Sequence, residues 1–225
     1  EDLGLFTCDE VIASDVTDIF NLLTGYAPDQ TFEKLLVAPK HMRTQVTDLI
    51  EFETNEAKAG RSARIIAKMN SLEDPLIIQK LYEASQAGVQ IDMIVRGVCR
   101  LIPGKQGLSE NIKVHSVIGR FLEHSRVFYF NHAEEHKYFI GSADWMHRNL
   151  DARVEALTPI EAPKLKKYLQ FIINVYLRDN MQRWLLKEDG SYEKIVRTKG
   201  TRKVSTHKVL MNHSTDSDIP IPMED

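Results

Sequence analysis

Short apolar runs alternating with helical patterns in the first half of this chain restrict its fold more than any other feature. Residues 32–38, 64–68 and 89–95 have the length and composition of buried strands. Two segments with apolar residues at helical spacing lie between them, one ending near Gly60 and one beginning at Asp74-Pro75. Such alternation predicts parallel strands with helices packed on the sheet faces. We therefore expect an α/β fold.

A β-hairpin is predicted in the second half, and it carries the most chemically informative residues. Apolar alternation over residues 127–129 and 138–140 flanks a short polar turn. We expect His124 inside the first of these strands, with Arg126 two residues away on the same face. A lone histidine would more often be satisfied by a carboxylate such as Glu123 or by a backbone carbonyl. The neighbouring arginine favours a functional site instead.

The ends of the second and third predicted strands are a further candidate position, because ligands of open α/β sheets bind beyond the carboxyl ends of the strands. Lys68-Met69-Asn70 follows the second strand, and Arg96-Gly97 follows the third. The Arg96 guanidinium would grip two phosphate oxygens at once, and Gly97 would let the backbone approach a bulky anion. From the residues alone, a simpler interpretation is slightly preferred: an arginine that caps a strand and pairs with a surface carboxylate.

The N-terminal residues predict one short helix outside the alternating pattern. Its apolar positions fall within residues 16–23, Ser14 or Asp15 is the expected N-cap, and Gly25 is the expected end. One helix cannot bury its own apolar stripe. It therefore belongs either to a preceding domain or against the flank of this one.

The C-terminal third predicts a long helix, a hairpin and a polar tail. Pro163 is expected to open an amphipathic helix, and Asp189-Gly190 is expected to turn a closing hairpin. Beyond Arg197 the chain is first basic and then acidic, with no apolar period. We expect a mobile tail without regular structure there.

Composition sets the remaining limits. The chain has 225 residues, 43% of them hydrophobic, which suits an ordinary packed core, and no run approaches the length of a membrane helix. Cys8 and Cys99 match no metal-binding spacing and suit a reducing cytoplasm. The net charge of −3 does not attract polyanions, so local arginines would have to do so. The first residues include neither an initiator methionine nor a signal peptide, so we expect an excised C-terminal piece.

Two motifs carry a resemblance to a known family. R-F-L-E-H-S-R at residues 120–126, followed by G-S-A-D-W-M-H-R-N-L-D-A-R-V-E at residues 141–155, resembles the C-terminal region of bacterial polyphosphate kinase, whose catalytic domains resemble phospholipase D domains. D-L-G-L-F-T, F-E-K-L-L-V-A-P and V-R-G-V-C-R-L-I-P-G extend the match from about Asp2 to about Asn180. The resemblance implies a phospholipase D-like mixed sheet flanked by helices. It also implies three parts: residues 1–30 as the tail of a preceding phospholipase D-like catalytic domain, 31–196 as the C-terminal domain and 197–225 as a polar tail.

The resemblance implies reversible transfer of the terminal phosphate of ATP to inorganic polyphosphate. The histidine that becomes phosphorylated lies in the preceding domain, so this chain would supply half of the site and be inactive alone. His124 would be the catalytic residue, and Arg96, His124 and Arg126 would contact ATP or phosphate. Two departures from the phospholipase D signature, Arg126 for its lysine and Asp144 for its asparagine, put lipase activity in doubt. We expect Asp144 to orient an arginine.

Cofactor, partners and location follow from the same resemblance. Mg²⁺ would accompany ATP, with its ligands outside this chain. The expected partners are ATP or ADP, inorganic polyphosphate, the upstream domains and further copies of the intact enzyme, but no nucleic acid. The enzyme would be cytoplasmic or associated with a membrane without spanning it. Two alternatives stay open: a catalytically silent polyphosphate- or nucleotide-binding module, and a phospholipase D-like phosphodiesterase that pairs two copies of His124 in a dimer.

One further motif matches a zinc-peptidase pattern. His132-Ala133-Glu134-Glu135-His136 reads H-x-x-E-H, which binds zinc only when both histidines lie on one helix. The segment is predicted to be a turn between two strands. We therefore expect no metal site in this chain. Ser142 is not expected to be a nucleophile either, because no G-x-S-x-G surrounds it.

Overall fold

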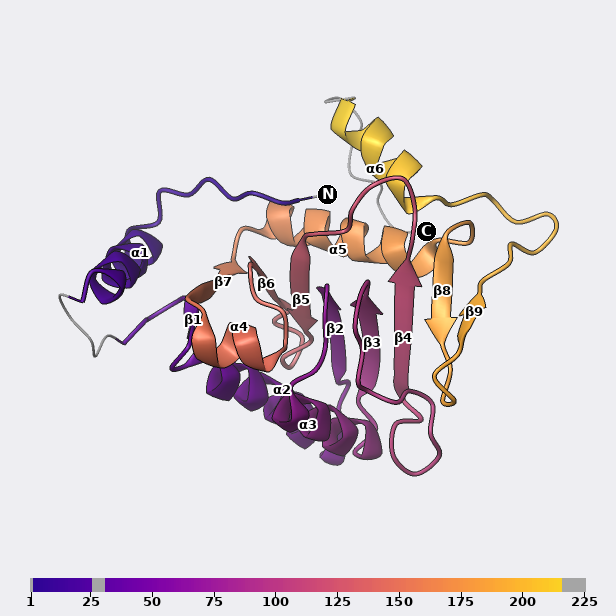
Figure 1. Cartoon of the computed structure of the whole chain (residues 1–225), viewed down its shortest axis with the longest axis horizontal. Helices are drawn as coiled ribbons and strands as arrows, with labels where there is room; N and C mark the ends of the chain where they lie inside the picture. The colour runs from indigo at the N-terminus through magenta and orange to yellow at the C-terminus, as the bar shows by residue number, and fades with distance from the viewer. Residues whose placement is uncertain (1, 26–30, 216–225) are drawn as a thin grey trace.

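One mixed β-sheet organises the molecule. The computed structural model describes residues 2–25 and 31–215, and within them nine strands form a sheet in the order β1-β7-β6-β5-β2-β3-β4-β8-β9 (Figure 1). The strands are β1 (Leu36–Ala38), β2 (Arg64–Met69), β3 (Gln90–Val95), β4 (Ile112–Val117), β5 (Arg126–Phe130), β6 (Lys137–Gly141), β7 (Glu155–Ile160), β8 (Arg183–Leu186) and β9 (Tyr192–Lys194).

The centre of the sheet is parallel, as the alternating pattern predicts. β2 pairs in parallel with β3, and β3 pairs in parallel with β4. β1 departs from the expectation, because it lies at the sheet edge and pairs antiparallel with β7. β5, β6 and β7 separate β1 from β2, although β1 still runs in the same direction as β2. Alternation thus predicted the direction of this strand but not its neighbour.

Helices cover both faces of the sheet, which confirms the predicted mixed sheet flanked by helices. α2 (Met42–Lys58), α3 (Pro75–Gln86) and α4 (His147–Ala152) pack on one face, and α5 (Pro163–Arg178) crosses the other (Figure 1). Along β2, Ile65, Ala67 and Met69 point into the first apolar cluster, whereas Ile66 points into the second. Each face therefore has its own buried core.

Local sequence signals explain where these helices begin. The Asp74 carboxylate accepts a hydrogen bond from the Ile77 amide at 3.0 Å, and Pro75 occupies the first helical position of α3. α5 likewise begins with a proline, Pro163. The predicted hairpin around Asp189-Gly190 is present as β8 and β9.

The N-terminal helix α1 (Glu10–Leu23) begins earlier than predicted. Its N-cap is Asp9, whose carboxylate accepts from the Ile12 amide at 2.9 Å. Asp15, an expected cap, is instead buried inside the helix and accepts hydrogen bonds from the backbone amides of Glu33, Lys34 and Leu35. The choice of Ser14 or Asp15 as cap was therefore wrong.

One side of α1 packs on the flank of the sheet. Ile12 forms a small buried cluster with Leu35, which precedes β1, and with Val37 inside β1. Val16, Phe20 and Leu23 of the same helix are exposed. Within the described residues α1 thus contacts the flank of this domain, and its assignment to a preceding domain stays a prediction.

The residues beyond Arg197 also differ from expectation. α6 (Thr206–Thr215) forms where no regular element was predicted, and it lies against α5 (Figure 1). Thr206 and His207 in its first turn are buried, and Leu210 packs against the α5-side cluster. No helix was predicted here because this segment has no apolar period. Two polar residues and one leucine are nevertheless enough to pack one face of α6. Residues 216–225 of the predicted tail, and 26–30 before the domain, lie outside the described residues.

None of the helices in the part of the chain that the structure describes is both long enough and apolar enough to cross a bilayer.

The Asp15 contacts give a first testable prediction. Replacing Asp15 with Ala leaves three backbone amides without their acceptor, which should weaken docking of α1 by roughly 2–4 kcal/mol. Hydrogen exchange at the amides of residues 33–35 should accelerate accordingly. Ser14→Ala is the matched control, because Ser14 is exposed and lies inside the helix. Equal exchange rates in the two variants would contradict this role of Asp15.

Candidate functional site

The three residues selected from the sequence lie at one end of the sheet. Val95 of β3 is level with Met69 of β2, and Val127 of β5 is level with Lys68, so Arg96 and Arg126 both stand at the carboxyl end of β2. Two strand spacings separate the backbones of β3 and β5 there, about 10 Å. His124 precedes Arg126 at the same end. Their chemical roles stay predictions.

His124 itself is not inside a strand, contrary to the prediction. β5 begins at Arg126, and residues 122–125 form the end of the β4–β5 connection. The side chain is half exposed, and its Nδ1 lies 2.9 Å from a carboxylate oxygen of Asp2, whose side chain is also exposed. The imidazole is thus presented at the surface, with one nitrogen held by a carboxylate.

Asp2 was not selected from the sequence. It lies within the D-L-G-L-F-T run, which carried part of the resemblance, but nothing local marks its carboxylate as a partner of a histidine 122 residues away. In Figure 1 the N-terminal segment runs toward the β4–β5 connection, where the two side chains meet.

Arg126 is held by Asp144, as the sequence predicted for that aspartate. Nε and Nη2 of Arg126 donate to the two oxygens of the Asp144 carboxylate at 3.2 and 3.3 Å, and both side chains are almost buried. Asp144 also accepts from the Asn70 amide at 2.7 Å, which ties the end of β2 to the G-S-A-D run. Nη1 of Arg126 donates to the backbone oxygen of His124 at 2.7 Å. Arg126 therefore positions the histidine's backbone.

A guanidinium has five N–H groups, and three of those of Arg126 are used in these contacts. One N–H on each terminal nitrogen remains for a ligand. Arg126 thus has a structural role that the sequence did not assign to it by number, and its contact with phosphate stays a prediction.

The structure explains why position 97 is a glycine, which the sequence alone did not. Its amide donates to the Asn70 carbonyl at 2.7 Å, and a Cβ at this position would stand 2.9 Å from that oxygen. The glycine therefore lets the segments that follow β2 and β3 lie close together. The approach of an anion is not needed to explain a glycine at this position. Arg96, one residue earlier, is partly exposed at the same end of the sheet.

Lys68, also noted at the end of the second strand, points away from the surface. Its ammonium is buried on the α5 face, 3.1 Å from the Glu123 carboxylate, and donates to both the backbone and hydroxyl oxygens of Ser125 at 2.9 Å. Tyr176 and His207 contact the same carboxylate. Sequence reasoning missed this cluster because its members come from four separate segments of the chain.

Electrostatics around Glu123 favour its charged form. Burial raises the pKa of this carboxyl, but the attraction of Lys68 and hydrogen bonds from Tyr176, His207 and Lys68 together hold the pKa below its ordinary value. The cluster is therefore a buried ion pair surrounded by hydrogen-bond donors.

The H-x-x-E-H segment lies in the β5–β6 turn, as predicted. Positive φ angles at His132, Ala133, Glu134 and His136 are incompatible with a right-handed helix. Over residues 2–25 and 31–215, no group of three or more His, Cys, Asp or Glu side chains is placed to hold a metal ion.

Carboxylates beside His124 do not fit a magnesium site either. Asp144 is engaged by Arg126 and the Asn70 amide, and Glu123 is buried against Lys68. Asp2 is the exposed one, and it contacts the imidazole. A hard divalent cation needs several oxygen ligands that are not already neutralised.

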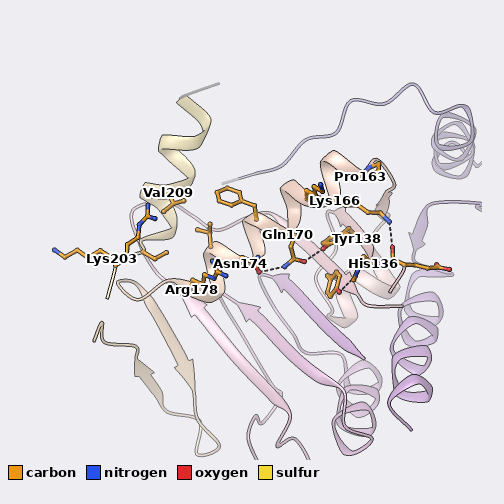
Figure 2. A pocket seen from close by; sticks show the side chains of 16 residues that line it. His136, Tyr138, Pro163, Lys166, Gln170, Asn174, Arg178, Lys203 and Val209 are labelled. Atoms are coloured by element: carbon orange, nitrogen blue, oxygen red, sulfur yellow. Dashed lines mark hydrogen bonds between the residues drawn. The ribbon is translucent and has the colours of Figure 1, made fainter. Parts of the chain in front are cut away.

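A groove of about 910 Å³ lies elsewhere, along α5 (Figure 2). None of His124, Arg96 and Arg126 lines it. Its polar groups mostly bond one another: the Tyr138 hydroxyl donates to Gln170, Gln170 donates to Asn174, and Lys166 donates to the Glu135 carbonyl. Its other cationic side chains are Lys167, Arg178, Arg202 and Lys203. Because none of the three residues selected from the sequence lines the groove, the candidate site remains at the end of the sheet.

Comparison with known proteins identifies the family of this chain. A family model described as polyphosphate kinase C-terminal domain 2 matches residues 35–207. The chain belongs to the polyphosphate kinase family. The matched residues include the end of β3, the His124 motif, the G-S-A-D run and the start of α6.

Individual polyphosphate kinases match most of the chain. It is 52% identical over 211 residues to the polyphosphate kinase of Thermosynechococcus vestitus, covering 94% of this chain and 29% of the relative. The Synechocystis enzyme is 56% identical over 191 residues, covering 85% and 26%. The crystal structure of polyphosphate kinase from Porphyromonas gingivalis superposes with a TM-score of 0.87 at 34% identity, covering 93% and 32%. The chain thus spans less than a third of the length of these relatives and corresponds to their C-terminal domain.

The Arg126–Asp144 pair gives a prediction about stability in this kinase domain. Asp144→Ala should destabilise the fold by about 3–5 kcal/mol, because it leaves a nearly buried guanidinium and the Asn70 amide without their acceptor. Asp144→Asn keeps an oxygen for Asn70 and should cost less. Denaturant unfolding of both variants measures the difference. A loss below 1 kcal/mol in Asp144→Ala would show that the pair does not hold the end of β2.

The lowered pKa of Glu123 predicts an acid-sensitive contribution to stability. A carboxyl whose pKa is lower in the folded state stabilises the protein above its unfolded pKa, and this stabilisation is lost as the pH falls through the folded value. Unfolding free energy should therefore fall between about pH 5 and pH 3 more steeply in the unmodified chain than in the double variant Lys68→Met, Glu123→Gln. Identical slopes would mean that Glu123 is not preferentially ionised in the fold.

Proposed function

We propose that this chain is the C-terminal catalytic domain of a polyphosphate kinase and contributes half of a site that transfers the terminal phosphate of ATP to inorganic polyphosphate. The carrying observation is the exposed His124 imidazole, set beside Arg126 at the sheet end where Arg96 also stands. The attacking histidine that becomes phosphorylated would belong to the upstream part of the kinase, as the family resemblance implies.

Phosphoryl transfer needs mainly positioning and positive charge at the oxygens of the transferred group. Arg96 and the remaining N–H groups of Arg126 would contact phosphate oxygens. Histidine is the side chain that most often acts as general acid or base, and the His124 imidazole would take this role for the leaving or entering oxygen. Asp2, on Nδ1, would hold the ring orientation and leave Nε2 toward the phosphate.

Mg²⁺ would arrive with ATP, since no cluster of unpaired carboxylates stands beside His124 in the described residues. The metal would neutralise charge on the nucleotide phosphates. This chain's own part would be to bind and orient the transferring group with Arg96, His124 and Arg126.

A catalytically silent anion-binding module would use the same arginines. Such a module has no need for an imidazole that is oriented by a carboxylate and exposed at the surface. The Asp2–His124 contact therefore favours a catalytic role. A phospholipase D-like phosphodiesterase is less consistent with Asp144, whose negative charge is committed to Arg126.

Replacing His124 in the full-length kinase tests the proposal directly. His124→Ala should lower kcat by a factor of about 10² to 10⁴, the usual contribution of general acid–base catalysis. The unfolding free energy should change by less than about 0.5 kcal/mol, because the side chain is exposed. Steady-state polyphosphate synthesis and denaturant unfolding give the two quantities.

His124→Gln separates two possible roles in the same assay. Glutamine retains hydrogen bonding but does not titrate, so turnover near that of the unmodified enzyme would assign His124 to hydrogen bonding alone. Unchanged turnover in His124→Ala as well would return His124 to a structural surface histidine and overturn the proposed function.

Binding to the isolated chain should be weak and sensitive to salt. Only part of the charge cradle is present, and the net charge is −3. Titration calorimetry with ATP and with polyphosphate at low and high salt checks this. Tight binding that salt does not weaken would mean that the ligand class is wrong. The isolated chain should also neither extend polyphosphate nor form phosphohistidine.

A further inference from the structure

The connection between β4 and β5 carries His124, and it is anchored from the α5 side of the sheet. It has no regular secondary structure over residues 118–125, yet Glu123 and Ser125 within it are buried while His124 between them is exposed. In Figure 1 the connection rises past the end of the sheet toward the first turn of α6. The residues on both sides of His124 are therefore held on the α5 side of the sheet.

Glu123 is the main anchor. One carboxylate oxygen lies 2.5 Å from Nε2 of His207, and the other accepts from the Tyr176 hydroxyl and lies 3.1 Å from the Lys68 ammonium. Glu123, Lys68 and His207 each have 4% or less of their side chain exposed, so these contacts are shielded from water. Lys68 in turn holds both oxygens of Ser125, on the other side of His124.

His207 joins this anchor to the C-terminal helix. Its Nδ1 lies 3.3 Å from the Phe121 amide, so one imidazole contacts the connection at two places. A Cβ on Gly119 would stand 2.6 Å from the same Nδ1, which shows how closely the connection lies over the ring. The first turn of α6 therefore lies directly against the connection.

The side-chain contact of His124 with Asp2 orients the ring but is too exposed to fix the position of the residue. An exposed contact such as Asp2–His124 contributes little to stability. Catalytic groups need to be held within about 0.5 Å, and a misplacement of 1 Å can reduce the rate about 100-fold. The precision has to come from contacts with the backbone on either side of His124, from Arg126 on one face of the sheet and from the buried Glu123 cluster on the other.

We infer that α6 is part of the catalytic apparatus: through His207 and Glu123, this C-terminal helix holds the β4–β5 connection so that His124 meets the transferring phosphate. His207, Glu123 and Lys68 are positioning residues, since none of them is exposed to substrate. The inference rests on the proposed role of His124.

Stability alone does not explain the cluster. Replacing a buried ion pair with apolar side chains of similar volume is often neutral or stabilising, so a purely structural helix could have docked through apolar contacts. α6 already has such a contact in Leu210, which packs against the α5-side cluster. The polar contacts at His207 add a specific position for the connection.

Two variants of the full-length kinase test this, with one matched control. His207→Phe keeps ring volume beside Phe121 but loses both hydrogen bonds. Gly119→Ala keeps the His207 imidazole but places a Cβ 2.3 Å from the Gln182 side chain and 2.6 Å from His207 Nδ1, so the connection and the ring cannot both keep their positions. Leu210→Ala, one turn further along α6, weakens helix docking without touching Glu123. Turnover, KM for ATP, unfolding free energy and hydrogen exchange of residues 118–126 are measured for each.

We expect His207→Phe and Gly119→Ala to lower kcat about 10- to 100-fold, with a smaller change in KM and faster exchange in residues 118–126. Leu210→Ala should lose stability but keep kcat. His124→Ala is measured alongside. If it lowers kcat while both test variants match Leu210→Ala, the positioning role is overturned and the proposed function stands. If His124→Ala has no effect, the proposed function itself fails. Should His207→Phe not fold, Gly119→Ala decides the question by the same comparison.

Discussion

Burial of the Lys68 ammonium is the constraint on which the rest of this site depends. A lysine at the end of a central strand, on a face covered by α5, cannot reach water and requires a carboxylate and further acceptors. Glu123 and Ser125 supply them, and both come from the connection that bears His124. Satisfying one buried charge in the sheet therefore determines the course of the chain around the candidate catalytic histidine.

On the opposite face, Asp144 performs the corresponding task for the other end of the same segment. It joins the exit of β2 to Arg126 at the start of β5, and Arg126 in turn holds the backbone oxygen of His124. The segment from Glu123 to Arg126 is thus fixed by a carboxylate–cation pair on each face of the sheet. The side chain of His124, between the two pairs, is exposed, but its backbone is held on both sides.

Local patterns were sufficient to predict the parallel centre of the sheet, the β5–β6 hairpin and the helix beginning at Pro163, because apolar periodicity and capping residues act over a few positions. The pairing of β1 with β7 joins residues about 120 positions apart, as in Leu36 and Leu157, and no local signal encodes it. The same limit hid the contacts of Asp2 with His124 and of His207 with Glu123. Candidate residues could be named from the sequence, but the groups that position them could not.

Exposure divides the charged pairs around the site into two kinds, and this difference bears on how an anion would bind. The Arg126–Asp144 pair is nearly buried, and parting it would strand a charge at a cost of several kcal/mol. The Asp2–His124 pair is exposed and contributes about 1 kcal/mol or less. An incoming phosphate would therefore compete with Asp2 far more readily than with Asp144. Because Asp144 keeps its hold on Arg126, the backbone that carries His124 would stay in place while the exposed imidazole adjusts to the phosphate.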